Sequence, residues 1–364
     1  MTRSISDLET PVALIDWGRV RANARAVADY CARHGIAWRP HVKTHKSVEV
    51  ARLQIQVGAQ GLTVATPHEA EVMARVTPDL LLAYPPVGPT KVERVVSLPD
   101  HVQLLVGLDS EEALRPLATA AAERGREVGI LVEADLGMRR VGIPDAQNVA
   151  RLAAVTRDLP GVRYAGIMFY PGHVRVPVDA QTDLLSALAD RLGKLLGTLG
   201  TNGLSPGIVS GGSTPTLWRS HELPGLTEVR PGTCIYNDRD IHTLGACAED
   251  DLAYSVLATV VSTAVPGQAV IDAGSKALAK EPFRAGGGGF GVLMGRPLVR
   301  VRALSEEHGI LDLTDVDWQP SVGDRVRVIP NHVCVSVNLQ ERVWALEGER
   351  VRPVALEGRG RSPI

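Results

Sequence analysis

The run Arg39–Lys46 concentrates groups that could carry chemistry, with Lys43 lying between His41 and His45. It stands at the end of a short apolar run and before an amphipathic segment, which is where a barrel strand would end. A lysine enclosed at that place loses hydration, and this favours the uncharged amine that forms Schiff bases. We therefore predict that Lys43 is a catalytic nucleophile, with His45 beside it as a candidate base. The alternative is a solvated basic turn, because most lysines are exposed.

A second candidate site is the turn Ser210–Thr214, which is rich in glycine and hydroxyl groups. Its backbone N–H groups and hydroxyls are not obstructed by bulky side chains, and proteins cradle phosphates with such groups. Glycine-serine turns are common, so this turn alone is weak support. The segments Gly137–Gly142 and Tyr170–His173 follow other apolar runs in the same way. A lysine and a phosphate-binding turn on one barrel rim form a much more specific combination.

A third candidate is the pair His332 and Cys334, which follows the alternating run Val326–Ile329. If that strand continues, residues two apart point to the same face, and the imidazole and thiolate could meet one cation. A sulfur ligand beside an imidazole favours zinc over magnesium or calcium. Catalytic zinc usually has three protein ligands, so water or the substrate would have to complete the shell. The structural alternative is a small buried cysteine and a packed histidine.

These candidates need a scaffold that brings the ends of many strands together. From residue 12 to about residue 240, short apolar runs alternate with helical patterns, which is typical of repeated βα units and a parallel sheet. The chain lacks a G-x-G-x-x-G segment after its first strand, which argues against a dinucleotide-binding sheet, so we expect a (β/α)8 TIM barrel. An opening strand at 11–15 and a helix at 17–34 precede eight predicted barrel strands, 36–42, 61–66, 79–84, 102–108, 127–135, 163–170, 206–211 and 226–235, and the helices between them are predicted at 48–57, 67–74, 110–124, 146–157 and 179–199.

Beyond residue 250 the apolar pattern changes to a period of two, which predicts antiparallel strands and a second, all-β domain. We place the barrel at residues 12–242 and the β domain at residues 1–11 and 243–364. The glycine-rich run 285–291 cannot pack as a regular element and predicts a mobile loop or a plain surface linker. The predicted strands of the β domain are residues 255–261, 269–272, 298–302, 324–329 and 342–346, with a turn at Glu347–Gly348 after the last of them.

The composition is that of an ordinary globular protein. The 364 residues are 45% hydrophobic and 22% charged, and a net charge of −2 gives no electrostatic reason to bind nucleic acid or an anionic membrane. Four scattered cysteines without CxxC pairs indicate neither a disulfide framework nor a compact zinc module. Neither an apolar leader at Met1–Glu9 nor a run long enough to span a bilayer is found. We therefore expect a cytoplasmic protein whose partners are small molecules or other subunits.

The motif Arg39–Lys46 resembles the lysine motif of the D-threonine aldolase and D-serine dehydratase family. These are fold-type III pyridoxal-phosphate enzymes related to alanine racemase, so the resemblance implies an alanine racemase-like barrel with a β domain. The similarity extends over nearly the whole chain. The other segments that carry it are Leu131–Glu133, Gly137–Gly142, Tyr170, Ser210–Thr214, Arg230–Gly232, Ile271–Gly274, Glu307–Gly309 and Asn331–Cys334.

The resemblance also implies roles for individual residues. Lys43 would carry pyridoxal 5'-phosphate as a Schiff base, Arg140 would contact the phenolic oxygen of the cofactor ring, and Tyr170 would lie beside the pyridine. The phosphate would be held by Gly212, Ser213, Thr214 and Tyr236. A divalent metal, with zinc favoured over manganese or magnesium, would bind at His332 and Cys334.

The activity implied is that of a lyase acting on D-3-hydroxy amino acids. Retro-aldol cleavage of D-threonine-type substrates to glycine and an aldehyde is the main expectation. The alternative is dehydration of D-serine or D-3-hydroxyaspartate to a 2-oxo acid and ammonia, since His332-x-Cys334 resembles the dehydratases more than the His-x-Asp of the aldolases. An amino-acid racemase and a pyridoxal-phosphate carrier are more remote, because neither needs a metal pair. Relatives of fold-type III imply a homodimer.

Overall fold

The structure is a computed structural model that describes residues 3–360. By their internal contacts these residues form two compact units, which we call the barrel unit and the β unit. The barrel unit comprises residues 26–232 and the C-terminal segment from Glu357, and the β unit comprises the chain up to Arg25 and residues 233–356. The limits of residues 12 and 242, expected from the sequence, stay a prediction about domain boundaries.

All eight barrel strands lie within or next to the predicted runs, and the predicted helices are present. Thr66 caps one of these helices, α3, by accepting the Glu69 N–H, and proline stands at its first position, so this helix begins as its sequence indicates. The helices and strands, in chain order, are α1 (Trp17–His34), β3 (Ala37–Trp38), the 3-10 turn η2 (Val42–Thr44), α2 (Val48–Gln56), β4 (Leu62–Val64), α3 (Pro67–Met73), β5 (Asp79–Leu82), α4 (Pro89–Val96), β6 (Gln103–Leu108), α5 (Glu111–Glu123), β7 (Val128–Glu133), α6 (Ala146–Asp158), β8 (Val162–Met168), η3 (Val178–Ala180), α7 (Thr182–Thr201), β9 (Ile208–Gly211), η4 (Leu217–Glu222) and β10 (Glu228–Val229).

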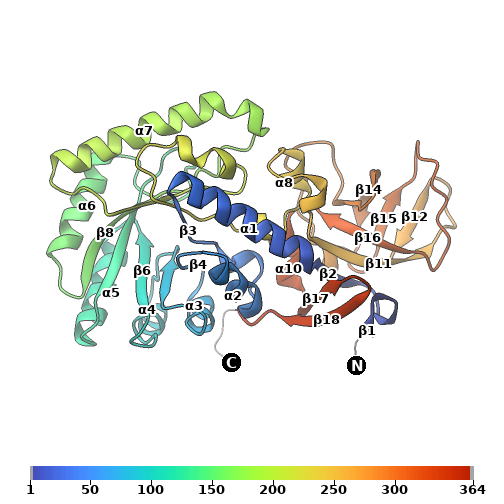
Figure 1. Ribbon diagram of the computed structural model, residues 1–364, viewed down its shortest axis with the longest axis horizontal. Helices are drawn as coiled ribbons and strands as arrows, with labels where there is room; N and C mark the ends of the chain where they lie inside the picture. Colours follow the sequence, from blue (N-terminus) through green and yellow to red (C-terminus); the bar gives the residue numbers. More distant parts are fainter. Residues whose placement is uncertain (1–2, 361–364) are drawn as a thin grey trace. The chain divides into compact units, whose positions relative to one another are not determined.

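The eight strands form one parallel sheet in the order β3-β10-β9-β8-β7-β6-β5-β4. An isolated parallel bridge between His41 and Thr63 and the bond from the Thr63 N–H to the Pro40 carbonyl oxygen, 2.8 Å, join its two ends. The sheet is therefore closed, which confirms the predicted (β/α)8 barrel. Helices α3 to α7 cover its outer face (Figure 1).

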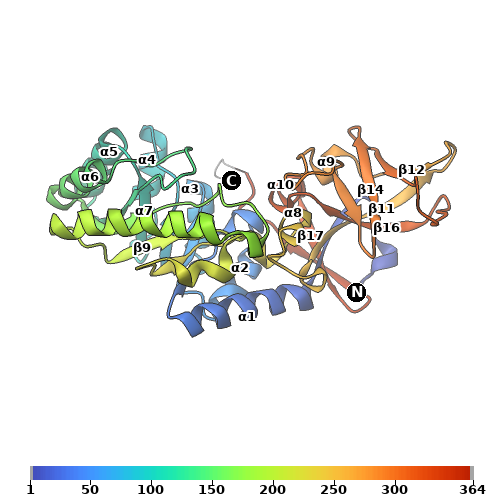
Figure 2. The same cartoon turned by 90° about the horizontal axis from the view of Figure 1, so that it is seen from above.

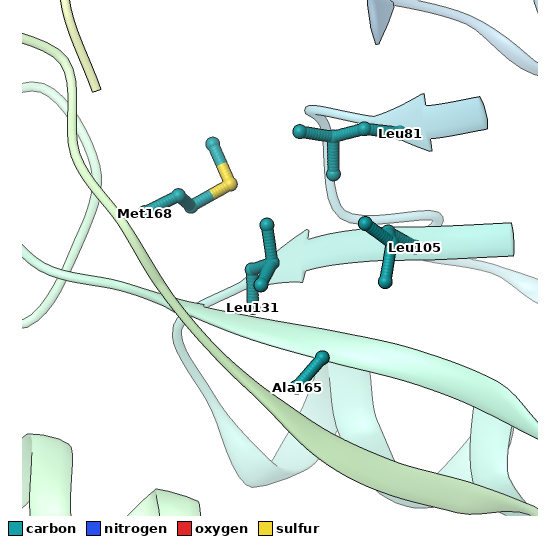
Figure 3. Close-up of a cluster of buried hydrophobic side chains, with 5 residues drawn as sticks. All are labelled: Leu81, Leu105, Leu131, Ala165 and Met168. Carbon is teal, nitrogen blue, oxygen red and sulfur yellow. The ribbon is translucent and has the colours of Figure 1, made fainter. Parts of the chain in front are cut away.

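The barrel core contains aliphatic side chains from neighbouring strands. Leu81 of β5, Leu105 of β6 and Leu131 of β7 form a buried cluster with Ala165 and Met168 of β8 (Figure 3). Strand β7 is buried at all of its positions, as expected for a parallel strand that is covered on both faces. This packing makes the strands a rigid support for the loops that follow their carboxyl ends.

The β unit contains antiparallel strands at all five predicted runs. Strands β11, β12, β14 and β16 gather in the orange part of the chain in Figure 2. The elements are β1 (Arg3–Ser4), η1 (Ile5–Asp7), β2 (Val12–Asp16), η5 (Thr233–Ile235), α8 (Arg239–Thr243), η6 (Glu249–Asp251), β11 (Tyr254–Ser262), β12 (Gln268–Ile271), α9 (Ser275–Leu278), β13 (Gly291–Leu293), β14 (Arg296–Leu304), β15 (Gly309–Asp312), β16 (Arg325–Pro330), α10 (Val333–Leu339), β17 (Arg342–Glu347) and β18 (Arg350–Ala355).

One sheet runs through the β unit in the order β1-β18-β17-β2-β11-β12-β15-β14-β13-β16, and β16 also pairs with β11. The second pairing closes six of the strands into a small barrel. The opening strand β2 belongs to this sheet, where it pairs antiparallel with β11 and parallel with β17. Within residues 3–360, we find no helix that combines the length and apolar character needed to cross a bilayer.

Candidate active site

Lys43 lies in η2, the turn that follows the first barrel strand at its carboxyl end. The segment that ends the barrel packs closely against this turn. A Cβ atom at Gly232 would lie 2.7 Å from the His41 carbonyl oxygen and 2.9 Å from Thr44 Oγ1, so only glycine allows the approach. The Lys43 side chain is exposed, which corrects the prediction that this lysine is enclosed. Its amine is therefore accessible to a ligand at the barrel rim.

The two histidines of the motif are held in their uncharged forms. His45 is fully buried, its Nε2 lies 3.2 Å from Gln54 Oε1, and its Nδ1 accepts the Ser47 N–H at 3.1 Å. Burial lowers the pKa of His45 to about 3. The pKa of His41 also lies well below its ordinary value, first because of burial and then because of the charge on Lys43. These contacts make His45 a support of the turn and do not favour the predicted role as a base.

The C-terminal segment holds the other side of the same turn. The Gly358 N–H donates to the Lys46 carbonyl oxygen at 2.8 Å, and the Val48 N–H donates to Glu357 Oε2 at 3.0 Å. Lys46 Nζ lies 2.6 Å from Oε1 of the buried Glu69. Because α2 begins at Val48, Glu357 supplies the capping oxygen that the Ser47 side chain does not provide. The backbone on both sides of Lys43 is thus fixed.

The predicted phosphate-binding turn follows β9. Gly212 has a φ of +79°, a conformation that glycine adopts without strain. Ser213 and Thr214 are buried, and the Ser213 hydroxyl lies 3.0 Å from Thr216 Oγ1. The Thr216 hydroxyl also accepts the Ser213 N–H at 3.2 Å. The turn is therefore compact, and it follows a strand at the same carboxyl-terminal end of the barrel as Lys43.

Arg140 and Tyr170 lie close together at this end of the barrel. The centre of the Arg140 guanidinium is 4.9 Å from the centre of the Tyr170 ring. Asp135 shapes the loop before Arg140, since its Oδ1 accepts the N–H groups of Gly137 at 2.8 Å and Arg139 at 3.0 Å. A cation and an aromatic ring are thus placed together, while their predicted roles around a cofactor ring stay a prediction.

A chain of buried polar groups crosses the interior of the barrel, and sequence analysis assigned it no role. Arg39 Nε lies 2.8 Å from Glu228 Oε2, and Glu228 also binds the Ser210 hydroxyl at 2.5 Å. Ser210 in turn accepts from Arg230, whose other nitrogen donates to the Phe169 carbonyl oxygen at 2.8 Å. Each member is buried and paired, so the network supports the carboxyl ends of β8, β9 and β10.

Glu133 at the carboxyl end of β7 adds a buried carboxyl group. Burial raises its pKa above the ordinary value, although the charges of Arg230 and Arg140 partly oppose this. Burial likewise lowers the pKa of Arg230, and Glu228 and Glu133 oppose that shift. The carboxyl and guanidinium groups therefore stabilise each other's charged forms at the rim.

These residues fit a cofactor that has an aldehyde, an aromatic ring and a phosphate. The exposed Lys43 amine, the Gly212–Thr214 turn and the Arg140 and Tyr170 pair all follow carboxyl ends of strands of one closed barrel. Functional groups of such barrels collect at that face. A cavity of about 640 Å3 instead opens among residues that begin strands or precede them, including Asp79 and Gln103. The rim that carries Lys43 is the candidate site, because the groups suited to a cofactor lie there.

The predicted metal pair lies in the β unit. Strand β16 ends at Pro330, His332 precedes α10, and Cys334 is the second residue of that helix. The prediction of a continuing strand is therefore wrong, but Cys334 still lies near enough to His332 to influence its pKa. Burial by itself lowers the pKa of His332, while Cys334 and Asp238 outweigh it and raise the pKa to about 11. The helical turn thus brings the two predicted ligands together.

Tyr236, predicted to bind the phosphate, also belongs to the β unit. It is fully buried, its ring stacks on Tyr254 with 6.0 Å between centroids, and its carbonyl oxygen accepts the Ala253 N–H at 2.8 Å. Its role as a phosphate ligand stays a prediction. Its N–H also donates to the Thr233 carbonyl oxygen at 3.1 Å, so aromatic packing and backbone hydrogen bonds hold this tyrosine in place.

The glycine-rich run is anchored by side chains from two other segments. Asn331 Nδ2 donates to the Gly289 carbonyl oxygen at 2.8 Å, and Arg239 donates to the Gly288 carbonyl oxygen at 3.1 Å. The Arg239 guanidinium lies 3.7 Å from the centre of the Phe283 ring. The run is therefore a loop tied to the neighbours of Asp238 and His332 rather than a plain linker. Its predicted mobility stays untested.

Two family models match the chain. Residues 15–240, more than half of its length, match "Alanine racemase, N-terminal domain", and residues 253–346 match "Putative serine dehydratase domain". D-threo-3-hydroxyaspartate dehydratase of Delftia sp. (strain HT23) is 33% identical over 359 residues, which cover 92% of this chain and 93% of the dehydratase. D-threonine aldolase of Arthrobacter sp. is 30% identical over 351 residues, which cover 93% of this chain and 89% of the aldolase. The chain belongs to the D-threonine aldolase and D-serine dehydratase family.

Membership of this family makes the protein a pyridoxal-phosphate-dependent lyase, and solved relatives have the same fold. D-threonine aldolase from Filomicrobium marinum has a TM-score of 0.90 at 28% identity, covering 99% of this chain and 98% of the aldolase. D-threo-3-hydroxyaspartate dehydratase from Delftia sp. HT23 has a TM-score of 0.88 at 32% identity, covering 99% of each chain.

Two variants of D-threo-3-hydroxyaspartate dehydratase bear on the metal pair predicted for the present chain, His332 and Cys334. In one a histidine is replaced by alanine, and in the other a cysteine two positions further on is replaced. The cysteine variant is described as a metal-free form. His332 and Cys334 have the same spacing and the same residue types.

Sequence analysis assigned no role to several residues that support the predicted ones through contacts. Glu357 caps the helix after Lys43, and Arg230 and Glu133 place buried charges at the rim. Asp238 binds His332 from 94 positions away in the chain. A helix-capping pattern could have identified Asp238 as a cap of α8, but no local signal links it to a histidine so distant in sequence.

Proposed function

We propose that the protein cleaves D-3-hydroxy amino acids by a retro-aldol reaction, giving glycine and an aldehyde from D-threonine-type substrates. The observation that carries this proposal is the common position of Lys43 and the Gly212–Thr214 turn at the carboxyl ends of β3 and β9 in one barrel. Pyridoxal phosphate, when bound, withdraws electrons from the α-carbon of an amino acid and so weakens its bonds. An exposed amine and a phosphate-binding turn are the two attachments that this cofactor needs.

In this proposal the barrel residues bind and orient. Lys43 Nζ forms the covalent attachment and, once released by the substrate, holds or delivers a proton at the α-carbon. Gly212, Ser213 and Thr214 bind the phosphate through backbone N–H groups and hydroxyls, with Tyr236 as a further ligand. Arg140 donates to the phenolic oxygen of the ring, and its charge is oriented by the face of Tyr170.

We further propose that His332 and Cys334 hold a divalent metal, with zinc favoured. An imidazole and a thiol that stand two residues apart and near each other are a donor set suited to zinc. Among the residues the structure describes, no group of three or more histidine, cysteine, aspartate and glutamate side chains could hold a metal ion. Water and the substrate would therefore complete the shell. A divalent cation lowers the pKa of a bound hydroxyl, which suits a substrate whose β-hydroxyl must lose its proton.

A second candidate function is the dehydration of D-serine or D-3-hydroxyaspartate to a 2-oxo acid and ammonia. Cys334 favours it, because the related D-threo-3-hydroxyaspartate dehydratase has a cysteine two positions after a histidine, and its cysteine variant is described as metal-free. In this reaction Lys43 Nζ would take the α-proton and the β-hydroxyl would leave. The two reactions differ in which bond at the α-carbon breaks.

We also propose that the protein is a cytoplasmic homodimer. All four cysteines are free thiols, which suits a reducing compartment. The dimer follows from the fold-type III relatives, which assemble as head-to-tail pairs. Light scattering on the purified, cofactor-loaded protein measures the assembly, and an active monomer contradicts it.

One assay distinguishes the two reactions. Purified protein with pyridoxal phosphate and zinc or manganese is offered D-threonine, D-serine and D-3-hydroxyaspartate, while glycine, aldehyde, ammonia and 2-oxo acid are measured. Aldehyde and glycine in equal amounts support the aldolase, and ammonia with a 2-oxo acid supports the dehydratase. A protein that binds the cofactor but leaves all three substrates unchanged contradicts both. Exhaustive chelation is expected to stop either reaction without releasing the cofactor, and unchanged activity removes the metal from the mechanism.

A further inference from the structure

The His332 side chain is held by a buried carboxylate that has no assigned role. Asp238 is fully buried, and its Oδ2 lies 3.1 Å from His332 Nδ1. The same oxygen accepts the Val333 N–H at 3.0 Å. The other oxygen, Oδ1, accepts the Ile241 N–H at 2.9 Å and so caps α8. Three N–H groups thus surround the carboxylate.

This arrangement determines what Asp238 contributes. Because both of its oxygens accept from protein N–H groups, it is placed to orient a ligand rather than to bind a metal itself. Its bond to His332 Nδ1 holds a proton on that nitrogen, so a bound cation would take the place of the proton on Nε2. The backbone of His332 is extended, with a φ of −134° and a ψ of 111°, and α10 starts at the next residue.

Burial gives this contact its strength. The Asp238 side chain is excluded from water and the His332 side chain is only 21% exposed. A charge-assisted hydrogen bond is stronger in such surroundings than at the surface. A carboxylate behind the histidine also adds a negative charge near the Cys334 side chain. Once a cation has replaced the thiol proton of Cys334 and the Nε2 proton of His332, two negative charges and a neutral imidazole would match the charge of a divalent cation.

We propose that Asp238 is the positioning residue that directs His332 Nε2, together with Cys334 Sγ, toward a divalent cation. This inference rests on the metal-assisted function proposed above. Asp238 fixes the ring orientation and the tautomer of the histidine, and it also fixes the first backbone N–H of α10 through Val333. Loss of the carboxylate therefore frees the histidine ring without removing either metal ligand.

The test uses Asp238→Asn in the cofactor-loaded protein. Asparagine caps a helix about as well as aspartate, so α8 is preserved. Its amide cannot place an anionic oxygen against His332 Nδ1 and against the Val333 N–H together. Zinc affinity, measured by competition with a chromophoric chelator, is expected to fall by about 10- to 100-fold. The cofactor absorbance and the far-ultraviolet circular dichroism are expected to stay unchanged.

Asp145→Asn provides a matched control. Asp145 caps α6 in the barrel unit by accepting the Asn148 N–H at 2.8 Å, so it has the same capping contact without a histidine. The zinc affinity of the Asp145→Asn variant is expected to equal that of the wild type. An equal loss in both variants, or a zinc affinity of D238N within about twofold of the wild type, overturns the role of Asp238.

A second measurement is made on the wild-type chain, and one variant serves only to assign the signal. Nitrogen-15 NMR of labelled histidine on the zinc-loaded protein is expected to show a protonated Nδ1 and a metal-bound Nε2 for the ring whose signal is lost in His332→Gln. Coordination through Nδ1 overturns the inference. Wild-type protein that binds no zinc contradicts the metal-assisted function as well, whereas normal zinc binding with Nδ1 coordinated contradicts the role of Asp238 alone.

Discussion

Glu357→Ala is expected to loosen the turn that carries Lys43, although Glu357 lies more than 300 positions further along the chain. Its Oε2 accepts the Val48 N–H at 3.0 Å, and the Ser47 side chain does not cap α2. Removing a capping acceptor costs about 0.5–2 kcal/mol. The bond from the Gly358 N–H to the Lys46 carbonyl oxygen, 2.8 Å, remains in the variant. We therefore expect a loss near the middle of this range, about 1 kcal/mol.

The effect of Glu357→Ala on stability is measured at the turn itself, residues 42–48. A loss of about 1 kcal/mol raises the population of the open turn by about fivefold, so amide exchange over residues 42–48 should accelerate by a similar factor. The melting temperature should fall by about 2–4 °C for a unit of this size. Glu357→Gln keeps an acceptor oxygen and is expected to show a smaller effect.

Glu123→Ala serves as the matched control, because it removes an exposed glutamate of α5 in the same unit. It is expected to change the melting temperature by less than about 2 °C, as surface substitutions usually do. Unchanged exchange over residues 42–48 in Glu357→Ala refutes the reasoning, even if the variant melts earlier. In that case Glu357 would stabilise the chain through contacts elsewhere.

Three other changes address the turn, the phosphate site and the effect of pH. Lys43→Ala should abolish the visible absorption of the attached cofactor, and a retained band would place the attachment on another lysine. Gly212→Ala should weaken cofactor binding by about tenfold, as measured by equilibrium dialysis. Alanine is strained by about 1–2 kcal/mol at a φ of +79°, and its Cβ would lie 3.0 Å from Val229 Cγ1. A variant that binds the cofactor as tightly as the wild type argues against phosphate binding at this turn. Burial lowers the pKa of His45 to about 3 in the folded chain, whereas this histidine titrates near pH 6.5 in the unfolded chain. As the pH falls from 6.5 toward 3, only the unfolded chain takes up the proton, so the free energy of unfolding should fall by up to about 1.4 kcal/mol per pH unit. Urea unfolding from pH 7 to pH 4 should show a shallower dependence in His45→Asn, and equal slopes in both proteins would contradict this account.

The sequence by itself determined the architecture and most of the barrel candidates. Apolar runs and helical patterns are local properties, so the eight strands, the helices between them and the change to period two after residue 250 could be located from neighbouring residues alone. The same locality placed Lys43 and Gly212–Thr214 at strand ends. Two local predictions were wrong: Lys43 is exposed rather than enclosed, and Cys334 lies in a helical turn rather than a strand. Both properties depend on the segments that pack around these residues.

Only the tertiary structure decided which groups support these candidates. Val48 and Glu357 are separated by 309 positions, and His332 and Asp238 by 94, so no spacing rule connects them. Such pairs form because folding buries hydrogen-bonding groups, and each buried donor then needs an acceptor from whichever segment lies beside it. The candidates for chemistry could therefore be predicted from the chain, whereas the residues that hold these candidates in position became visible only in the folded protein.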